Sequence, residues 1–223
     1  MSNNEKQALE TKQEIKESVK RYKDLYKEAN GFVDEKYADL LKNAKNDLAK
    51  ILDVAEKNKV FSSDVFKSLR SLFNDVATDS QSLDAINKFE NFADDISVDV
   101  SLETALEFFE KAKSELNNFT NAYKTKGFSK KFFNNLVNIL NLYSQSRSKE
   151  AKLLYDELKV PVNGLGGLYK NNKLTDVVVY GCLEDINNVL DKYIRDFKNR
   201  ISSNKTGQDW INQVVSDIFK RNQ

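Results

Sequence analysis

The 223-residue chain contains no histidine, one cysteine and one proline. Without histidine there is no Ser-His-Asp or Cys-His arrangement and no Glu-x-x-His di-iron pair, and the commonest general base is missing. The single cysteine, Cys182, excludes an internal disulfide and, in a chain without histidine, a Cys/His zinc site. These absences lead us to expect a protein that is not an enzyme and that holds no cofactor and no metal.

Glycine and long apolar runs are also scarce. Seven glycines and one proline are too few for the many turns of an all-β fold. No apolar stretch approaches the roughly 18 residues of a membrane-spanning helix. The polar N-terminus, "MSNNEKQALETKQEIKES", has no secretory signal pattern. We therefore expect a soluble helical protein that is cytoplasmic, or exported without a recognisable signal peptide.

Charge is abundant but balanced, with 35 basic and 34 acidic residues and a net charge of +1. This balance argues against duplex DNA or an anionic membrane as a bulk electrostatic partner. Arginine, the side chain best suited to bidentate phosphate or base contacts, supplies six of the 35 cations. The sequence therefore indicates no nucleic-acid partner. The 25 asparagines and 29 lysines are typical of AT-rich coding DNA and are treated as background.

Helical periodicity is the main positive signal. In the first segment, apolar residues recur four, three, four and three positions apart: Ile15, Val19, Tyr22, Tyr26 and Ala29. This spacing is the seam of a helix that pairs with another helix. Gly31 follows as a helix end or hinge, so residues 3–58 form a long helical hairpin or one bent helix. The first four seam residues are candidates for binding a protein partner or a second copy, and an intramolecular partner is equally available.

Similar patterns predict short helices over residues 62–97, long helices over 101–159 and 174–203, and a C-terminal helix over 206–220. Helix caps are expected at Ser62 or Ser63, Ser101, Ser129, Thr206 and Gly127. The predicted fold is all-α, an elongated bundle of seven to nine helices in a single domain, 1–223. The β-branched stretch "LTDVVVYG" leaves a small β-hairpin near residues 165–181 open as an alternative.

The stretch "VPVNGLGGLYKNN", residues 160–172, holds Pro161 and three of the seven glycines. A phosphate loop requires G-x-x-x-x-G-K-[ST], or G-x-G-x-x-G between a strand and a helix, and neither pattern is present. The plainest interpretation is a connector, in which Pro161 stops one helix and the glycines permit the turn.

A membrane-inserting tip is the alternative for this segment. From Val160 to Thr175 no residue is acidic, and four side chains are candidates for contact with lipid: Val162, Leu165, Leu168 and Tyr169. Long amphipathic helices flank the segment on both sides. This layout resembles that of helical pore-forming toxins of the haemolysin E type, whose tongue is longer and more apolar. The resemblance implies a membrane-active protein that uses residues 160–180.

Acidic residues concentrate in "FADDISVDVSLETALEFFE", residues 92–110. The spacing does not match a calcium-binding loop, and acids in a first helical turn complement the helix dipole. We therefore interpret this stretch as a solvated helix face.

The leading hypothesis is a non-catalytic helical interaction protein. It is followed by the membrane-active protein and then by an enzyme that uses carboxylates such as Asp95, Asp99 or Glu103, or lysine and tyrosine chemistry.

Overall fold

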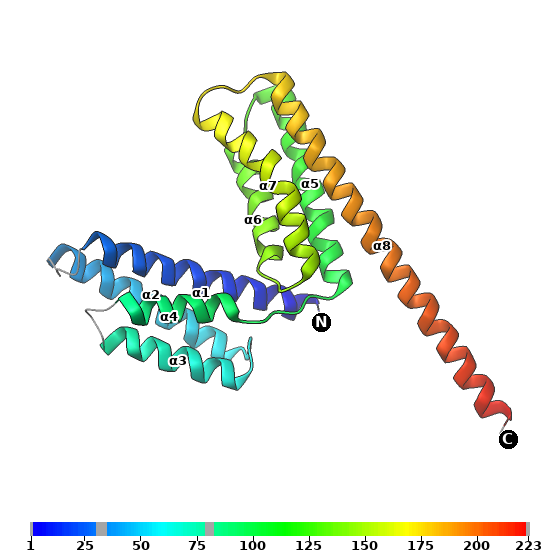
Figure 1. Ribbon diagram of the computed structural model, residues 1–223, viewed down its shortest axis with the longest axis horizontal. Coiled ribbons are helices and arrows are strands. Elements are labelled where there is room, and N and C mark those ends of the chain that lie inside the picture. The colour runs from blue at the N-terminus through cyan, green and yellow to red at the C-terminus, as the bar shows by residue number, and fades with distance from the viewer. Residues whose placement is uncertain (1, 30–34, 79–82, 222–223) are drawn as a thin grey trace. The chain divides into compact units, whose positions relative to one another are not determined.

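Figure 1 shows the chain as a computed structural model, which describes residues 2–29, 35–78 and 83–221. These residues form eight helices and no strand, so the all-α prediction is confirmed and the alternative hairpin near residues 165–181 is not formed. The helices gather into two compact units, Met1–Asp99 and Val100–Gln223, and each is described by itself. That the chain is a single domain stays a prediction.

The first unit contains the helices α1 (Ser2–Glu28), α2 (Glu35–Lys57), α3 (Ser63–Thr78) and α4 (Leu83–Asp95). Both α1 and α3 pack against α2 and α4. The helices α1 and α2 run antiparallel, as the expected hairpin requires, with Arg21 Nη1 3.1 Å from Asp47 Oδ2. Gly31, expected as a helix end or hinge, lies outside the described residues.

A buried cation holds α1 to the segment that follows α4. Lys12 is only 3% exposed, and its Nζ donates a hydrogen bond to the backbone carbonyl of Ile96 at 2.8 Å. Nearer solvent, α1 and α4 are joined by Lys23 and Glu90, whose Nζ and Oε2 atoms lie 2.6 Å apart. Buried cations are tolerated when such donors are satisfied, so these bonds specify how α4 returns along α1.

The second unit contains the helices α5 (Leu102–Lys126), α6 (Lys130–Ser144), α7 (Lys149–Lys170) and α8 (Asp176–Arg221). Both α5 and α7 pack against α6 and α8, so the first half of α8 completes a four-helix bundle. Phe109 lies inside this bundle, with its ring centroid 5.0 Å from those of Tyr143 and Phe197. Edge-to-face contacts of this kind add to the free energy of burying the rings.

Several helix ends form as the sequence predicts. The Oγ of Ser101 accepts the N–H of Thr104 at 3.2 Å, and Gly127, at φ +76°, closes α5 by donating its N–H to Tyr123. Ser148 caps the start of α7, where its Oγ accepts the N–H of Ala151 at 2.9 Å. The sequence analysis did not predict this helix start. The long helices expected over residues 101–159, divided into two by the ends at Gly127 and Ser129, are therefore three: α5, α6 and the first half of α7.

The expectation that Pro161 stops a helix is wrong, because α7 continues through it to Lys170. Proline removes one backbone hydrogen bond and crowds the preceding turn. Packing beyond Pro161 offsets this loss, because Leu165 is fully buried. Gly166 lies against α6, where a Cβ would stand 3.6 Å from the ring of Phe133. The connector between α7 and α8 is thus short, at residues 171–175.

The two helices expected over residues 174–203 and 206–220 are one helix, α8, of 46 residues. Thr206 does not cap a new helix, because its Oγ1 donates to the carbonyl of Ser202 at 2.9 Å within the continuing helix. Gly207 weakens a helix without breaking it.

Candidate functional site

Residues 202–220 of α8, called here the α8 end, are exposed along their whole length. Six large apolar side chains in this segment are between 36% and 70% exposed: Trp210, Ile211, Val214, Val215, Ile218 and Phe219. Residues three or four positions apart share one side of a helix. The six side chains therefore form a single stripe, called here the apolar face.

The other side of the α8 end is polar and nearly neutral. Gln208 donates to Asn212 and Gln213 donates to Asp217, both at 3.1 Å, and bonds of this spacing stabilise a helix locally. Lysines and aspartates are interspersed along the segment: Lys205, Asp209, Asp217 and Lys220. The α8 end is therefore an amphipathic helix with little net charge.

The α8 end is uncovered within the second unit because α8 is longer than the helices it packs against. α5 runs antiparallel to α8: Tyr123, near the end of α5, donates to Asp176 at 2.6 Å, while Glu110 lies 2.9 Å from Lys198. The helices α5 and α7 begin at Leu102 and Lys149. Beyond these starting points no other helix of the second unit accompanies α8, as Figure 1 shows.

Arg200 marks the point where α8 leaves the bundle. One guanidinium nitrogen lies 2.9 Å from Glu150 at the start of α7, and the guanidinium also lies over the ring of Phe197. The hydrogen bond from Arg200 lowers the pKa of the Glu150 carboxyl. The last contacts of α8 with the bundle are thus an ion pair and a buried ring, and the apolar face begins about three turns later.

The apolar face is large for a surface patch. From the exposed fractions of its side chains, it presents about 600 Å² of apolar area. Patches of this size on a folded chain mark sites that bind protein or membrane, whereas isolated exposed apolar residues carry no such meaning. The α8 end is therefore the candidate functional site.

The predicted partner-binding residues lie elsewhere and are buried. Ile15, Val19, Tyr22 and Tyr26 are 0%, 2%, 4% and 8% exposed, at the seam where α1 packs with α2 and α4. Burial also raises the pKa of the Tyr22 phenol. In the folded first unit this seam is occupied by the chain itself, so it does not present these side chains to a partner.

The predicted membrane-tip residues come together in the last turns of α7. Leu165 is fully buried, Val162 and Leu168 are half-buried, and Tyr169 stacks on Phe128 with ring centroids 4.2 Å apart. Reaching lipid with these side chains would require unpacking Leu165 from the bundle. Across the described ranges, no helix combines the length and the apolar character needed to cross a bilayer.

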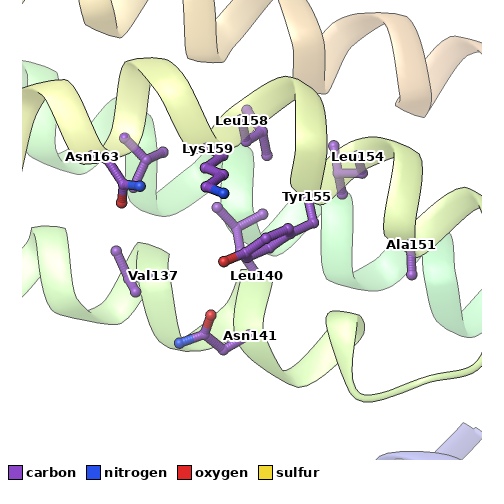
Figure 2. A pocket seen from close by; sticks show the side chains of 10 residues that line it. Val137, Leu140, Asn141, Ala151, Leu154, Tyr155, Leu158, Lys159 and Asn163 are labelled. Atoms are coloured by element: carbon purple, nitrogen blue, oxygen red, sulfur yellow. The ribbon is translucent and has the colours of Figure 1, made fainter.

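A small apolar pocket lies between α6 and α7 (Figure 2). It encloses about 110 Å³ and is lined by residues such as Val137, Leu140 and Leu158, with Tyr155 and Lys159. Sites for small ligands are usually about 300–1,000 Å³ and combine an apolar wall with converging polar groups. This pocket is smaller and has one charged side chain, so it suits a single apolar side chain better than a cofactor.

No match to this chain is found among protein-family models, curated proteins or solved structures. Its function is therefore argued from its own residues.

Two acidic residues of the stretch 92–110 take part in ion pairs. Asp94 lies 2.8 Å from Lys16, and Glu110 pairs with Lys198. Among the residues that the structure describes, no group of three or more Cys, Asp or Glu side chains could hold a metal ion.

Between α7 and α8, Tyr193 donates to Glu157 at 3.1 Å, and burial together with this carboxylate raises the pKa of the phenol. These contacts join neighbouring helices.

Sequence reasoning recognised the apolar stripe over residues 206–220 but not its exposure. Apolar periodicity shows that a helix has one face to bury, and it does not show what covers that face. The signal that could have indicated it is the order of the residues. The helices that pack against α8, α5 and α7, have 25 and 22 residues, whereas α8 has 46, and six large apolar residues follow Gly207 in its second half.

Proposed function

We propose that this protein is a non-catalytic helical interaction protein whose binding element is the α8 end. One observation carries the proposal: an exposed, continuous apolar face on a helix that extends beyond the bundle holding its first half. Amphipathic helices that present anchors at this spacing dock into apolar grooves or against other helices. The bundle of α5, α6 and α7 holds the base of this helix and orients it.

The chemistry of the apolar face favours a protein over a lipid surface. Helices that lie on membranes carry an excess of lysine and arginine on their polar side. In the α8 end, Lys205 and Lys220 are balanced by Asp209 and Asp217. The membrane-active alternative through residues 160–180 is disfavoured because Leu165 is part of the bundle core.

The proposal is tested by photo-crosslinking from the apolar face. Replacing Trp210 with the photoreactive aromatic p-benzoylphenylalanine keeps a large ring on the surface. We expect protein adducts of discrete mass when cells of origin producing this variant are illuminated. The matched control places the same residue at Val177, which is 84% exposed on the first turn of the same helix. A second control adds Val214→Asp and Val215→Asp, which should remove the adducts.

Lipid vesicles test the alternative, in which the apolar face binds a membrane. Trp210 is the only tryptophan, so the tryptophan emission of the unmodified protein reports on the apolar face alone. We expect its emission to be unchanged by phosphatidylcholine vesicles and by vesicles containing phosphatidylserine. A blue shift with vesicles, together with no protein adducts from position 210, would overturn the proposal in favour of membrane binding.

A further inference from the structure

We propose that the occupant of the apolar face is the α8 end of a second copy of this chain, running antiparallel to the first. The inference rests on the proposed function and names the partner of the same surface. The pair is an isologous dimer, in which each copy contributes the same residues about a two-fold axis. Each α8 end then covers the other where α5 and α7 no longer reach.

The area available is sufficient for such a dimer. The apolar face presents about 600 Å² on each copy, so a pair can cover at most about 1,200 Å² before any polar rim is counted. Stable, specific interfaces bury about 1,200–2,000 Å² in total. The pair lies at the lower end of this range, and we expect a dissociation constant of about a micromolar.

The charges of the α8 end permit self-association. A surface of one sign would repel a second copy, and this segment instead carries Lys205, Asp209, Asp217 and Lys220. The apolar face itself contains no charged side chain. Two copies can therefore pair without placing charged side chains, of like or opposite sign, at the centre of the interface.

The orientation follows from the bundle. The buried residues of the first half of α8 face α5 and α7: Val179, Leu183, Ile186, Leu190, Tyr193 and Phe197. The apolar face continues this stripe in part: at about 100° per residue, Ile211, Val215 and Phe219 fall on the same side of the helix, and Trp210 and Val214 are turned about 100° or more away from it. A parallel second α8 lying on the apolar face would run along that side into the space that α5 and α7 fill. An antiparallel one enters from the free end, where α5, α6 and α7 do not extend beside α8 (Figure 1).

The first test is sedimentation equilibrium of the full chain between about 0.5 and 100 µM. We expect a reversible change from 25.6 kDa to twice that mass. Val214→Asp with Val215→Asp places two carboxylates in the centre of the interface and should weaken the dimer by about 100-fold or more. Both side chains are exposed in the single chain, so the variant should keep its fold. Val177→Asp, the same change at the other end of α8, should leave the dimer intact.

The second test measures orientation with spin labels in a Cys182→Ala background. Labels at Asn199, about 15 residues before the centre of the pair, should be separated by about 45 Å along the helix axis in an antiparallel dimer. Labels at Gln213, close to the centre, should have almost no axial separation. A parallel dimer would give similar distances at the two positions. That result would overturn the orientation.

The failures of the two proposals can be distinguished. A protein that stays monomeric up to 100 µM, with Trp210 open to iodide quenching, overturns the pairing and leaves a different protein partner for the α8 end. A dimer that tolerates Val214→Asp with Val215→Asp also overturns the pairing. A monomer in which Trp210 is already shielded from iodide means that the surface is covered within the chain, and it overturns both proposals.

Discussion

The glycines of α7 provide a test of the helix through Pro161. Gly164 and Gly167 lie in α7, and a Cβ built on either meets no atom within 4 Å. Alanine should therefore fit both positions without strain. Because glycine within a helix costs about 0.5–1 kcal/mol relative to alanine, we expect Gly164→Ala with Gly167→Ala to raise the free energy of unfolding by about 1–2 kcal/mol.

Urea unfolding followed by circular dichroism at 222 nm measures this change as a higher midpoint at constant slope. Gly127→Ala is the matched control with the opposite expected sign. Gly127 has φ +76° and ψ −163°, a conformation open almost only to glycine, so alanine should cost about 1–3 kcal/mol. If alanine at Gly164 and Gly167 lowered the midpoint as it does at Gly127, residues 160–170 would be a turn and the helix through Pro161 would be refuted.

Three further results are expected. Leu165→Ala should lower the free energy of unfolding in urea by about 2–5 kcal/mol, because this side chain is fully buried. Val160→Ala, at a position 78% exposed, should change it by less than about 0.5 kcal/mol. Equal effects of the two variants would contradict the packing of α7. Lys12→Met should cost about 1–3 kcal/mol in the same assay by leaving a buried carbonyl without its donor, and a neutral result would contradict that bond. The Tyr123 phenol, whose hydrogen bond to Asp176 raises its pKa to about 12, should titrate near pH 12 by NMR and at a lower pH in Asp176→Asn. Because this pKa is higher in the folded state, the stabilisation is complete below about pH 10 and is lost as the pH rises through about 12.

Local signals in the sequence predicted the helices well where a helix end depends on its own residues. Ser101 and Gly127 have cap chemistry that acts within one turn, and both cap α5 as expected. Pro161 misled because its effect depends on packing beyond its own turn, whereas Thr206 misled because its side chain also bonds within a continuing helix. Burial of Leu165 holds α7 together beyond the proline, and Thr206 bonds back to Ser202 within an unbroken helix.

The candidate site could be predicted only in part. The seam beginning at Ile15 and the stripe beginning at Trp210 have similar apolar periodicity in the sequence, yet the structure buries the first and exposes the second. Periodicity indicates that one face of a helix is apolar. Whether another helix buries that face depends on the lengths of helices that are distant in the sequence. In the second unit these are α5 and α7, which begin at Leu102 and Lys149 and so leave the α8 end bare.

Iodide quenching of Trp210 in dilute protein measures whether the apolar face is open to solvent, because this side chain is 68% exposed on that face and is the only tryptophan. At about 0.1 µM, where the proposed pair is dissociated, we expect emission typical of tryptophan in water and quenching close to that of the unfolded chain in urea. Emission shifted to the blue and resistant to iodide at this concentration would show that the chain covers its own apolar face. That result would contradict the assignment of the α8 end as a binding surface.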